Sequence, residues 1–391
     1  VADVLFAAEA LAQPPAVLAI AHWSDLLNFR GEVPAPTFAL EPDIALLVYT
    51  SGTTGMPKGA CLSHRAVMAA AELYAGRYAH TDLRSLLNLP INHVGALIDL
   101  TAAAIAMGGT LVAMREFRPE AIPGVLRQER VTILGQVPTM HLMIEAEGGS
   151  YSPERYPDLR HIVWSGAAMP RGFIERHHGR GIELSTCYGQ TECTGSVTFT
   201  APDATVEALA ASVGQPAAPG LVRIVAEDGT PAAQGEPGEV QISGDCLMSG
   251  YFRRPEPTAE AFTGGWLRTG DLGVIDETGA LRLAGRLKEM FKSGGYNVYP
   301  REVEIVLEEH PAVSAAAVIA VPDPVWQEIG WAFLIAEPDA REDDIAAFAR
   351  ARLANFKVPK RFILRPELPL LPIGKIDKRA LREAAFEGNH A

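Results

Sequence analysis

Short apolar runs alternate with helix-like patterns through about the first 280 residues of the chain. The run Ile44–Tyr49 is followed by Thr, Ser and Gly residues, which predicts a buried strand that leads into a loop. Further strands are predicted at Val4–Ala7, Thr110–Ala113, Val131–Leu134 and His161–Trp164. Helices are predicted between these runs at Ser63–Tyr78 and Pro119–Gln128. This alternation predicts mostly parallel sheets covered by helices.

The pattern changes twice further along the chain. From Gly214 apolar and polar residues alternate more strictly, which predicts a small antiparallel sheet or barrel over residues 214–286. Its strands are predicted at Val222–Val225, Gly238–Ile242 and Leu281–Leu283. After Arg286 a compact α/β pattern follows, with helices at Arg301–His310 and Asp343–Leu353 and strands at Val313–Val321, Trp331–Ile335 and Arg361–Leu364.

These patterns together predict an α/β protein of two domains. The first domain spans residues 1–286 and contains mostly parallel sheets covered by helices, with the small antiparallel β-subdomain at residues 214–286. The second is a separate small α/β domain over residues 287–391, about 100 residues and therefore of ordinary domain size.

Composition and charge narrow the classes of partner. The chain has 391 residues, 48% of them hydrophobic, and its 34 basic and 47 acidic residues give a formal net charge of −13. This charge disfavours nucleic acid or an anionic membrane as the main partner. The longest apolar stretch, Leu97–Met114, is interrupted by Asp99 and two glycines, so no membrane span is expected. The four cysteines lack a short paired spacing, which favours reduced thiols and a cytoplasmic location; a homodimer is compatible with the sequence.

The most distinctive segment is Tyr49–Gly59, which follows the predicted strand. Its glycines allow backbone N–H groups to turn toward an anion, its hydroxyls add donors, and Lys58 adds positive charge. The spacing is not that of the GxxxxGK[ST] loop, because Gly52 and Gly55 are too close together and Gly59 follows Lys58. From composition alone, a phosphate-binding loop and a solvated turn both stay open.

A set of short motifs in order resembles the adenylate-forming superfamily, which includes acyl-CoA synthetases, adenylation domains of peptide synthetases and luciferases. The segment Tyr49–Gly59 looks like the phosphate loop of that family. The other matching segments are Trp164–Ala168, Tyr188–Glu192, Thr269–Asp271, Gly285–Lys288 and Gly374–Lys375. Together they cover residues 40–380, and the branch they resemble most is the acyl-CoA synthetases.

The resemblance implies an ATP site and a catalytic lysine. Glu192 would bind Mg²⁺, Thr191 would reach the α-phosphate, and Lys375 would bridge the carboxylate and phosphoryl oxygens in the transition state. Asp271 and Arg286 would bind the ribose. The ATP-binding residues implied are Thr50, Ser51, Gly52, Thr53, Thr54, Gly55, Lys58, Ser165, Gly166, Ala167, Tyr188, Gly189, Asp271 and Arg286.

The resemblance also implies a CoA loop and an acyl pocket. Lys288 matches the family's hinge, and Gly294–Gly295 lies in the segment that faces the active site in the second half-reaction. His93 matches a substrate-side histidine, although Asn92 stands where family members have an aromatic residue. The acyl pocket residues implied are His93, Ser165, Cys187, Gly189, Thr194 and Gly195.

The expected function is activation of a carboxylic acid with ATP and transfer of the acyl group to CoA. A fatty or aromatic acid is expected, because Asn92–His93 stands where peptide-synthetase domains hold an amino acid with Asp, and Asp99 lies several residues away. Two alternatives stay open: a ligase that loads a carrier protein, and a truncated nucleotide-binding paralogue. The second arises because Thr50 lies much nearer the first residue than in the family, which favours a missing N-terminal part.

Overall fold

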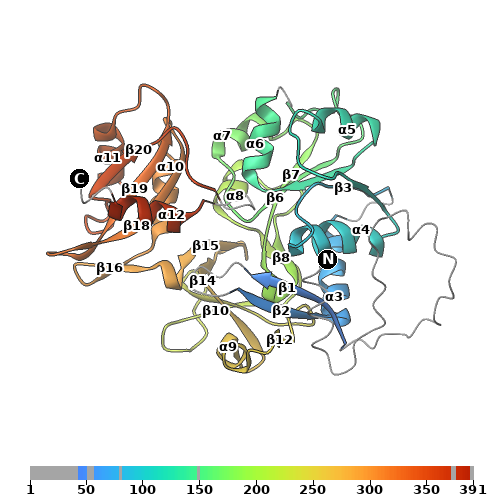
Figure 1. Ribbon diagram of the computed structural model, residues 1–391, viewed down its shortest axis with the longest axis horizontal. Coiled ribbons are helices and arrows are strands. Elements are labelled where there is room, and N and C mark those ends of the chain that lie inside the picture. The colour runs from blue at the N-terminus through green and yellow to red at the C-terminus, as the bar shows by residue number, and fades with distance from the viewer. Residues whose placement is uncertain (1–42, 51–56, 79–81, 148–149, 371–375, 388–391) are drawn as a thin grey trace. The chain divides into compact units, whose positions relative to one another are not determined.

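The computed structural model describes residues 43–50, 57–78, 82–147, 150–370 and 376–387 (Figure 1). The predicted strand Val4–Ala7 lies outside the described residues. Within them, the α/β fold class is confirmed, with a large mixed sheet and smaller antiparallel sheets.

The largest sheet has seven strands in the order β4-β3-β5-β6-β7-β8-β9. Neighbouring strands are parallel from β4 to β7, and β8 and β9 are antiparallel. The strands are β3 (Arg84–Leu87), β4 (Thr110–Ala113), β5 (Ile133–Gln136), β6 (His161–Ser165), β7 (Glu183–Gln190), β8 (Gly195–Phe199) and β9 (Gln215–Pro216).

Consecutive apolar residues in the central strands pack into two different hydrophobic clusters, because side chains alternate between the faces of a sheet. Ile133 and Val163 pack with Tyr74 and Tyr78 in one buried cluster. Leu134 and Ile162 belong to another cluster with the helices that cover the opposite face. Continuous apolar runs of this kind are typical of strands that are buried on both sides.

Helices supply the outer layers of this sheet (Figure 1). The cluster with Tyr74 contains residues of α3 (His64–Arg77) and α4 (Ala103–Ala106). The π-helix η1 (Gly95–Ala102) leads directly into α4. The other cluster contains residues of α5 (Ile122–Gln128), α6 (Pro138–Ala146), α7 (Arg171–His177) and α8 (Val206–Ala211).

Local sequence explains where two of these helices begin. The Ser63 hydroxyl accepts a hydrogen bond from the Ala66 N–H at 3.1 Å, so a capped start of α3 follows the predicted boundary. By contrast, α5 starts three residues after the predicted Pro119. Pro123 occupies its first turn, which is where a helix tolerates proline.

The prediction that Ile44–Tyr49 forms a strand is confirmed, but the prediction that this strand is buried is wrong. It forms β1 (Ile44–Thr50), which pairs antiparallel with β2 (Lys58–Ser63) in a three-stranded sheet completed by β12 (Gly250–Tyr251). Only Val48 is buried, and Ile44 and Tyr49 are 44% and 58% exposed. The apolar run therefore reflects an end strand of a small sheet and not the centre of a parallel one.

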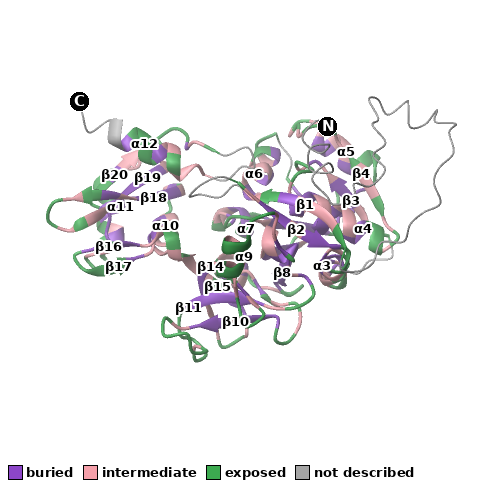
Figure 2. Ribbon diagram, turned by 60° about the horizontal axis from the view of Figure 1, so that its bottom comes forward, coloured by how far each residue is buried: buried purple, intermediate pink, exposed green. Residues whose placement is uncertain are grey.

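A five-stranded antiparallel sheet follows, as the alternating pattern predicted. Its order is β10-β11-β14-β13, and β15 also pairs with β14. Its elements are β10 (Val222–Val225), β11 (Gly238–Ile242), β13 (Phe262–Thr263), β14 (Trp266–Ile275), β15 (Leu281–Arg286) and the helix α9 (Pro255–Ala261). Every residue of β11 is buried, whereas no residue of α9 is (Figure 2).

The remaining strands form a mixed sheet in the order β17-β16-β19-β18, with β20 parallel to β19. Val318 packs with α10 and α11 on one face, and Ile319 packs with Leu381 of α12 on the other. The elements are η3 (Leu287–Glu289), β16 (Phe291–Ser293), β17 (Tyr296–Val298), α10 (Pro300–Glu308), β18 (Val313–Asp323), β19 (Gln327–Ala336), α11 (Glu342–Arg350), β20 (Arg361–Leu364) and α12 (Lys378–Glu387).

Candidate active site

The segment predicted to bind phosphate connects two paired strands. Thr50 and Lys58 lie opposite each other at the ends of β1 and β2, and the Thr50 hydroxyl donates to the Lys58 carbonyl at 3.4 Å. Ser51, Gly52, Thr53, Thr54 and Gly55 lie outside the described residues, so their predicted role stays a prediction. What the structure describes is a hairpin that closes at Thr50 and carries Lys58 at its base.

One tyrosine joins this hairpin to the predicted magnesium ligand. The Lys58 Nζ lies 4.7 Å from the centre of the Tyr251 ring, a cation–π contact. The Tyr251 hydroxyl donates to Glu192 Oε1 at 2.8 Å. Burial, and then the nearby Glu192, raise the pKa of Tyr251, which keeps its proton on this donor. The Tyr251 side chain thus contacts a cation through its ring and a carboxylate through its hydroxyl.

Glu192 has a position that suits a magnesium ligand. It lies in η2 (Thr191–Cys193), between β7 and β8, and its backbone carbonyl accepts from the Met248 N–H at 2.8 Å. Its side chain is partly exposed, and its Oε2 has no hydrogen bond to a described residue. Mg²⁺ is commonly held by one or two carboxylates together with substrate phosphates, so one carboxylate with a free oxygen fits this chemistry.

Asp271 is the centre of a second polar cluster. Its Oδ2 accepts from the Tyr188 hydroxyl at 2.7 Å and from Gln190 Nε2 at 2.6 Å. Its Oδ1 lies 2.9 Å from Arg286 Nε, on the residue opposite it in the β14–β15 ladder. Burial, followed by the Asp271 charge, raises the pKa of Tyr188, so this phenol stays a donor. Asp271 and Arg286, which were predicted to bind the same ribose, are in contact here, and Tyr188 from another motif joins them.

The predicted adenine-side residues follow the end of β6. Ser165 is the last residue of this strand, and Gly166 has a φ of +82°, a conformation that favours glycine. Gly166 and Ala167 are exposed. The carboxyl ends of parallel strands are where α/β sheets bind ligands, and the adenine-side role of these three residues stays a prediction.

The predicted acyl pocket contains a small cavity. Its volume is about 20 Å³, and it is lined by residues of α3, η1, β5, β6 and β7. Ser165 and Cys187 are among the lining residues, together with Tyr74, Gly95, Asp99 and Gly135. Burial, and then Asp99, raise the pKa of Cys187 to about 12, so this side chain is a neutral thiol near neutral pH.

Asp99 is a buried carboxylate on the wall of this cavity. The side chain of Ser196 donates to its Oδ2 at 2.8 Å, and the Ser196 N–H donates to its Oδ1 at 3.1 Å. Burial raises the pKa of Asp99 to about 6 in spite of these hydrogen bonds. No described residue forms an ion pair with it.

The other residues predicted for the acyl pocket do not line this cavity. The ring of His93 accepts from the Gly95 N–H at 3.2 Å, next to the wall. The Thr194 hydroxyl donates to the Cys246 carbonyl at 2.6 Å. An added Cβ on Gly189 would overlap the Gly195 carbonyl of the paired strand β8, and an added Cβ on Gly195 would overlap Asp99 of η1. Their role in binding the acid stays a prediction.

The predicted CoA loop is a tight hairpin between β16 and β17. Gly294 and Gly295 have φ values of +58° and +86°, as a two-residue turn of this kind requires. A Cβ on Gly294 would lie 2.6 Å from the Trp326 ring. Lys288, the predicted hinge, is exposed in η3, and Lys375 lies outside the described residues. These glycines are thus explained by the turn, and their role toward CoA is untested.

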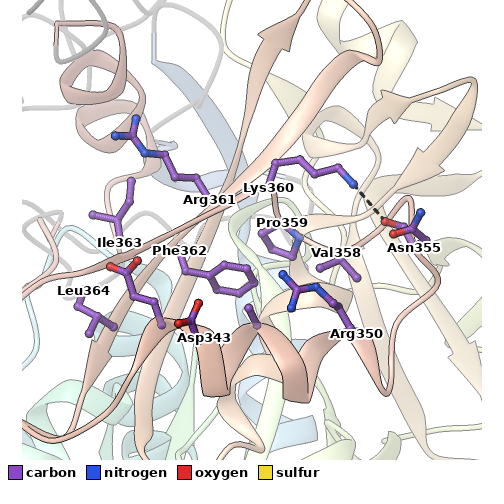
Figure 3. A pocket seen from close by; sticks show the side chains of 12 residues that line it. Asp343, Arg350, Asn355, Val358, Pro359, Lys360, Arg361, Phe362, Ile363 and Leu364 are labelled. Carbon is purple, nitrogen blue, oxygen red and sulfur yellow. Dashed lines mark hydrogen bonds between the residues drawn. The ribbon is translucent and has the colours of Figure 1, made fainter.

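A larger cavity lies elsewhere and contains none of the predicted site residues. It has a volume of about 580 Å³ between α11 and the segment that includes β20 (Figure 3). Asp343, Arg350 and Lys360 are among the side chains around it. Lys360 Nζ already lies 5.0 Å from the centre of the Trp326 ring. Size alone would select this cavity, but the chemistry of the motifs selects the other region.

Three residues of the site were missed by sequence reasoning. Tyr251 had no local signal, because its short strand places it near Lys58 through the fold alone. Gln190 stands inside the predicted motif but was given no role. Asp99 was noted as an interruption of an apolar stretch and was set aside as an amino-acid ligand, yet a lone carboxylate in such a stretch is a signal of a buried, functional group.

Comparison with known families agrees with this geometry. A model described as AMP-binding enzyme matches residues 5–252, and one described as AMP-binding enzyme C-terminal domain matches residues 302–375. The chain belongs to the AMP-binding enzyme family. The predicted enzyme class, an AMP-forming ligase of the acyl-CoA synthetase branch, is confirmed.

Individual relatives show how broad the family is. The chain is 38% identical to a feruloyl-CoA synthase of Amycolatopsis sp over 87% of its length and 70% of that protein. It is also 38% identical to the long-chain-fatty-acid–CoA ligase FadD13 of Mycobacterium tuberculosis, over 98% of its length and 76% of that protein. Its structure is similar to o-succinylbenzoate CoA synthetase of Bacillus subtilis in complex with an acyl-adenylate, with a TM-score of 0.78, 30% identity and coverage of 88% and 70% of the two chains.

None of the helices in the described residues combines the length and the apolar character needed to cross a bilayer.

The contact between Tyr251 and Glu192 can be tested with Tyr251→Phe. This change removes the donor to Glu192 but keeps the ring beside Lys58. A net hydrogen bond contributes about 0.5–1.5 kcal/mol, so we expect roughly a 3- to 10-fold loss in kcat/KM for ATP and a higher half-saturating Mg²⁺ concentration. Pyrophosphate release over a Mg²⁺ titration measures both. Tyr156→Phe removes a buried hydroxyl without a partner in the described residues and should change neither; equal effects of the two variants would contradict the role of Tyr251.

The raised pKa of Asp99 predicts a pH-dependent stability. Folding raises this pKa from 3.8 to about 6, so the folded chain holds the proton more tightly. The associated stabilisation is fully present below pH 4 and is lost as the pH rises through 6. In Asp99→Asn this loss is absent. The free energy of unfolding of the variant relative to wild type should therefore rise between pH 4 and 7, by on the order of 3 kcal/mol.

Denaturant unfolding of wild type and Asp99→Asn at several pH values measures this difference. The matched control is Asp203→Asn, at an exposed position, which should follow wild type at every pH. A constant difference between Asp99→Asn and wild type would contradict the assignment.

Proposed function

We propose that the chain is an acyl-CoA ligase with two half-reactions. In the first, a carboxylate oxygen of the acid attacks the α-phosphorus of ATP and pyrophosphate leaves. In the second, the thiolate sulfur of CoA attacks the acyl carbon of the resulting acyl-adenylate and AMP leaves. The observation that carries the proposal is that Lys58 and Glu192 both contact the Tyr251 side chain. Bringing two anions together requires positioned positive charge, which Lys58 would supply directly and Glu192 would supply by holding Mg²⁺.

Asp271 retains capacity for a sugar hydroxyl. A carboxylate offers about four acceptor positions, and Tyr188, Gln190 and Arg286 use three of them. The remaining position can accept from a vicinal hydroxyl, which is what the proposed ribose contact needs. Tyr188, Gln190 and Arg286 fix the orientation of the Asp271 carboxylate and therefore the direction of its remaining acceptor position.

A bound Mg²⁺ would neutralise part of the negative charge of the phosphates. Glu192 would hold it through the oxygen that Tyr251 does not use, and Tyr251 fixes the orientation of the carboxylate. Lys58 would add a second positive charge toward the β- and γ-phosphates. The described residues contain no group of three or more metal-binding side chains, which suits an ion held largely by substrate phosphates.

The second half-reaction requires different groups at the same acyl carbon. We propose that residues 287–391 form a mobile domain that turns about Lys288, which withdraws Lys375 and presents Gly294–Gly295 to the thiol. The two separate family matches, 5–252 and 302–375, support a boundary between them. Lys288 is exposed in a single short turn between β15 and β16, where a change of backbone angles disturbs little packing.

The acid is fatty or aromatic in this proposal, since the relatives include one named for feruloyl-CoA and one for long-chain fatty acids. Pyrophosphate release across a panel of both kinds of acid, with and without CoA, tests the function. Release together with formation of acyl-CoA supports it. Release without consumption of CoA would indicate a ligase that loads a carrier protein, and ATP binding without release from any acid would indicate a nucleotide-binding paralogue.

Lys375→Ala separates the two half-reactions. Because one positioned donor in a transition state contributes about 10²–10³ in rate, we expect at least a 100-fold loss of pyrophosphate release. Conversion of supplied acyl-adenylate to acyl-CoA should stay within about 3-fold of wild type, since the lysine is withdrawn in that step. Lys360→Ala, at the larger cavity, is the control and should leave both steps unchanged. Equal loss of both steps in Lys375→Ala would contradict the assignment.

A further inference from the structure

The wall of the small cavity in the predicted acyl pocket contains a buried carboxylate that forms no ion pair with a described residue. Asp99 is 7% exposed and lines the cavity together with Tyr74. Its two oxygens accept only from Ser196 among the described residues, and no described cation pairs with it. A buried carboxylate in such surroundings is costly, so a site that keeps it has a use for it.

A second unpartnered polar group faces the same cavity. Tyr74 is 3% exposed, and its hydroxyl forms no hydrogen bond with a described residue. The hydroxyl lies 3.5 Å from the position that a Cβ on Gly135 would occupy. Burial raises the pKa of Tyr74, so the hydroxyl can both donate and accept. The cavity therefore presents an acceptor at Asp99 and an amphoteric group at Tyr74.

The backbone around Asp99 leaves room for this carboxylate. Gly195 follows the turn after β7, and a Cβ there would lie 2.6 Å from Asp99 Oδ1. Asp99 itself lies in η1, the π-helix, a type of helix that occurs frequently at functional sites. The carboxylate is thus accommodated by a glycine on one side and a widened helical turn on the other.

Charge and space indicate what part of a substrate this cavity suits. The Asp99 charge repels the carboxylate of the acid, so that group lies elsewhere. A saturated tail would cover Asp99 and Tyr74 without supplying a donor, which leaves buried polar groups unpaired. The volume of about 20 Å³ is close to that of one water-sized group.

We propose that this cavity selects carboxylic acids whose acyl part carries a hydrogen-bond donor, a hydroxyl or an amino group, which donates to Asp99. This inference rests on the proposed ligase function and names its substrate class. Asp99 contacts the substrate and determines specificity, and Tyr74 is the second contact. The saturated fatty acid without such a group becomes a poor substrate.

Matched acids that differ in one group test the proposal. Hexanoate, 6-hydroxyhexanoate and 6-aminohexanoate form one series, and benzoate, 4-hydroxybenzoate and 4-(aminomethyl)benzoate form another. For wild type we expect kcat/KM of pyrophosphate release to be about 10- to 100-fold higher for a donor-bearing acid than for its parent, the size expected for a hydrogen bond to a charged group. A preference for the hydroxyl or for the ammonium member identifies which donor is used.

Asp99→Leu should reverse this preference, with kcat/KM for the parent acids equal to or above that for their substituted forms. The same variant should unfold at a higher temperature than wild type, because it removes a buried charge without a counter-ion. A purely structural Asp99 would instead give a lower melting temperature and an equal loss for all acids. Asp203→Leu, at an exposed position, is the matched control and should keep the wild-type preference.

The outcomes separate this inference from the function on which it rests. Release from the parent acids at equal or higher kcat/KM than from the donor-bearing acids overturns the inference and leaves the ligase intact. Absence of release from every acid overturns the ligase and the inference with it. If Asp99→Leu fails to fold, calorimetric binding of the matched acids to wild type decides the question, and equal affinity for both members of each pair overturns the inference.

Discussion

The close approach of β7 and β8 is the constraint on which the described site depends. A Cβ on Gly189 would overlap the carbonyl oxygen of Gly195, so the two strands can pair here only with glycine at this position. The end of β7 places Gln190 beside Asp271, the turn after it places Glu192 beside Tyr251, and β8 places Ser196 beside Asp99. One tight hairpin thereby orients residues that were proposed for the nucleotide site and for the acid site, and a shift of its register would disturb both sets of contacts.

The sequence named candidate residues for the site but not the contacts that their side chains make. Asp271 and Arg286 were predicted from separate motifs, and the β14–β15 ladder shows why they meet. Tyr251 could not be predicted, because its contacts with Lys58 and Glu192 come from pairing between segments far apart in the chain. The bounds of β10, β11 and β20 were predicted correctly, whereas β19 begins four residues before the predicted Trp331. The predicted burial of β1 was wrong, since an apolar run does not reveal whether one or both faces of a strand are covered.

In its proposed role, Asp99 lowers stability in exchange for substrate specificity. An apolar side chain at this position would fit the rest of η1, whose residues Ala96, Ile98 and Leu100 are also buried. The chain instead retains a carboxylate whose burial raises its pKa, and a glycine that makes room for it. Local choices that oppose folding are expected where binding needs them. A carboxylate that is kept for binding would interrupt an apolar stretch in the sequence and line a cavity in the structure, and Asp99 does both.

The proposed exchange of groups also requires that residues 287–391 keep their shape while they turn. The long β18–β19 ladder packs on both faces, and two clusters divide its apolar residues between them. Lys378, at the start of α12, pairs with the buried Glu304 of α10 at 2.8 Å and with Glu289 beside the hinge at 2.9 Å. Removing one member of a buried pair leaves an uncompensated charge, so these contacts resist separation of α12 from α10. A unit held in this way can carry Lys375 and Gly294–Gly295 on one body, and a single rotation can then exchange one for the other.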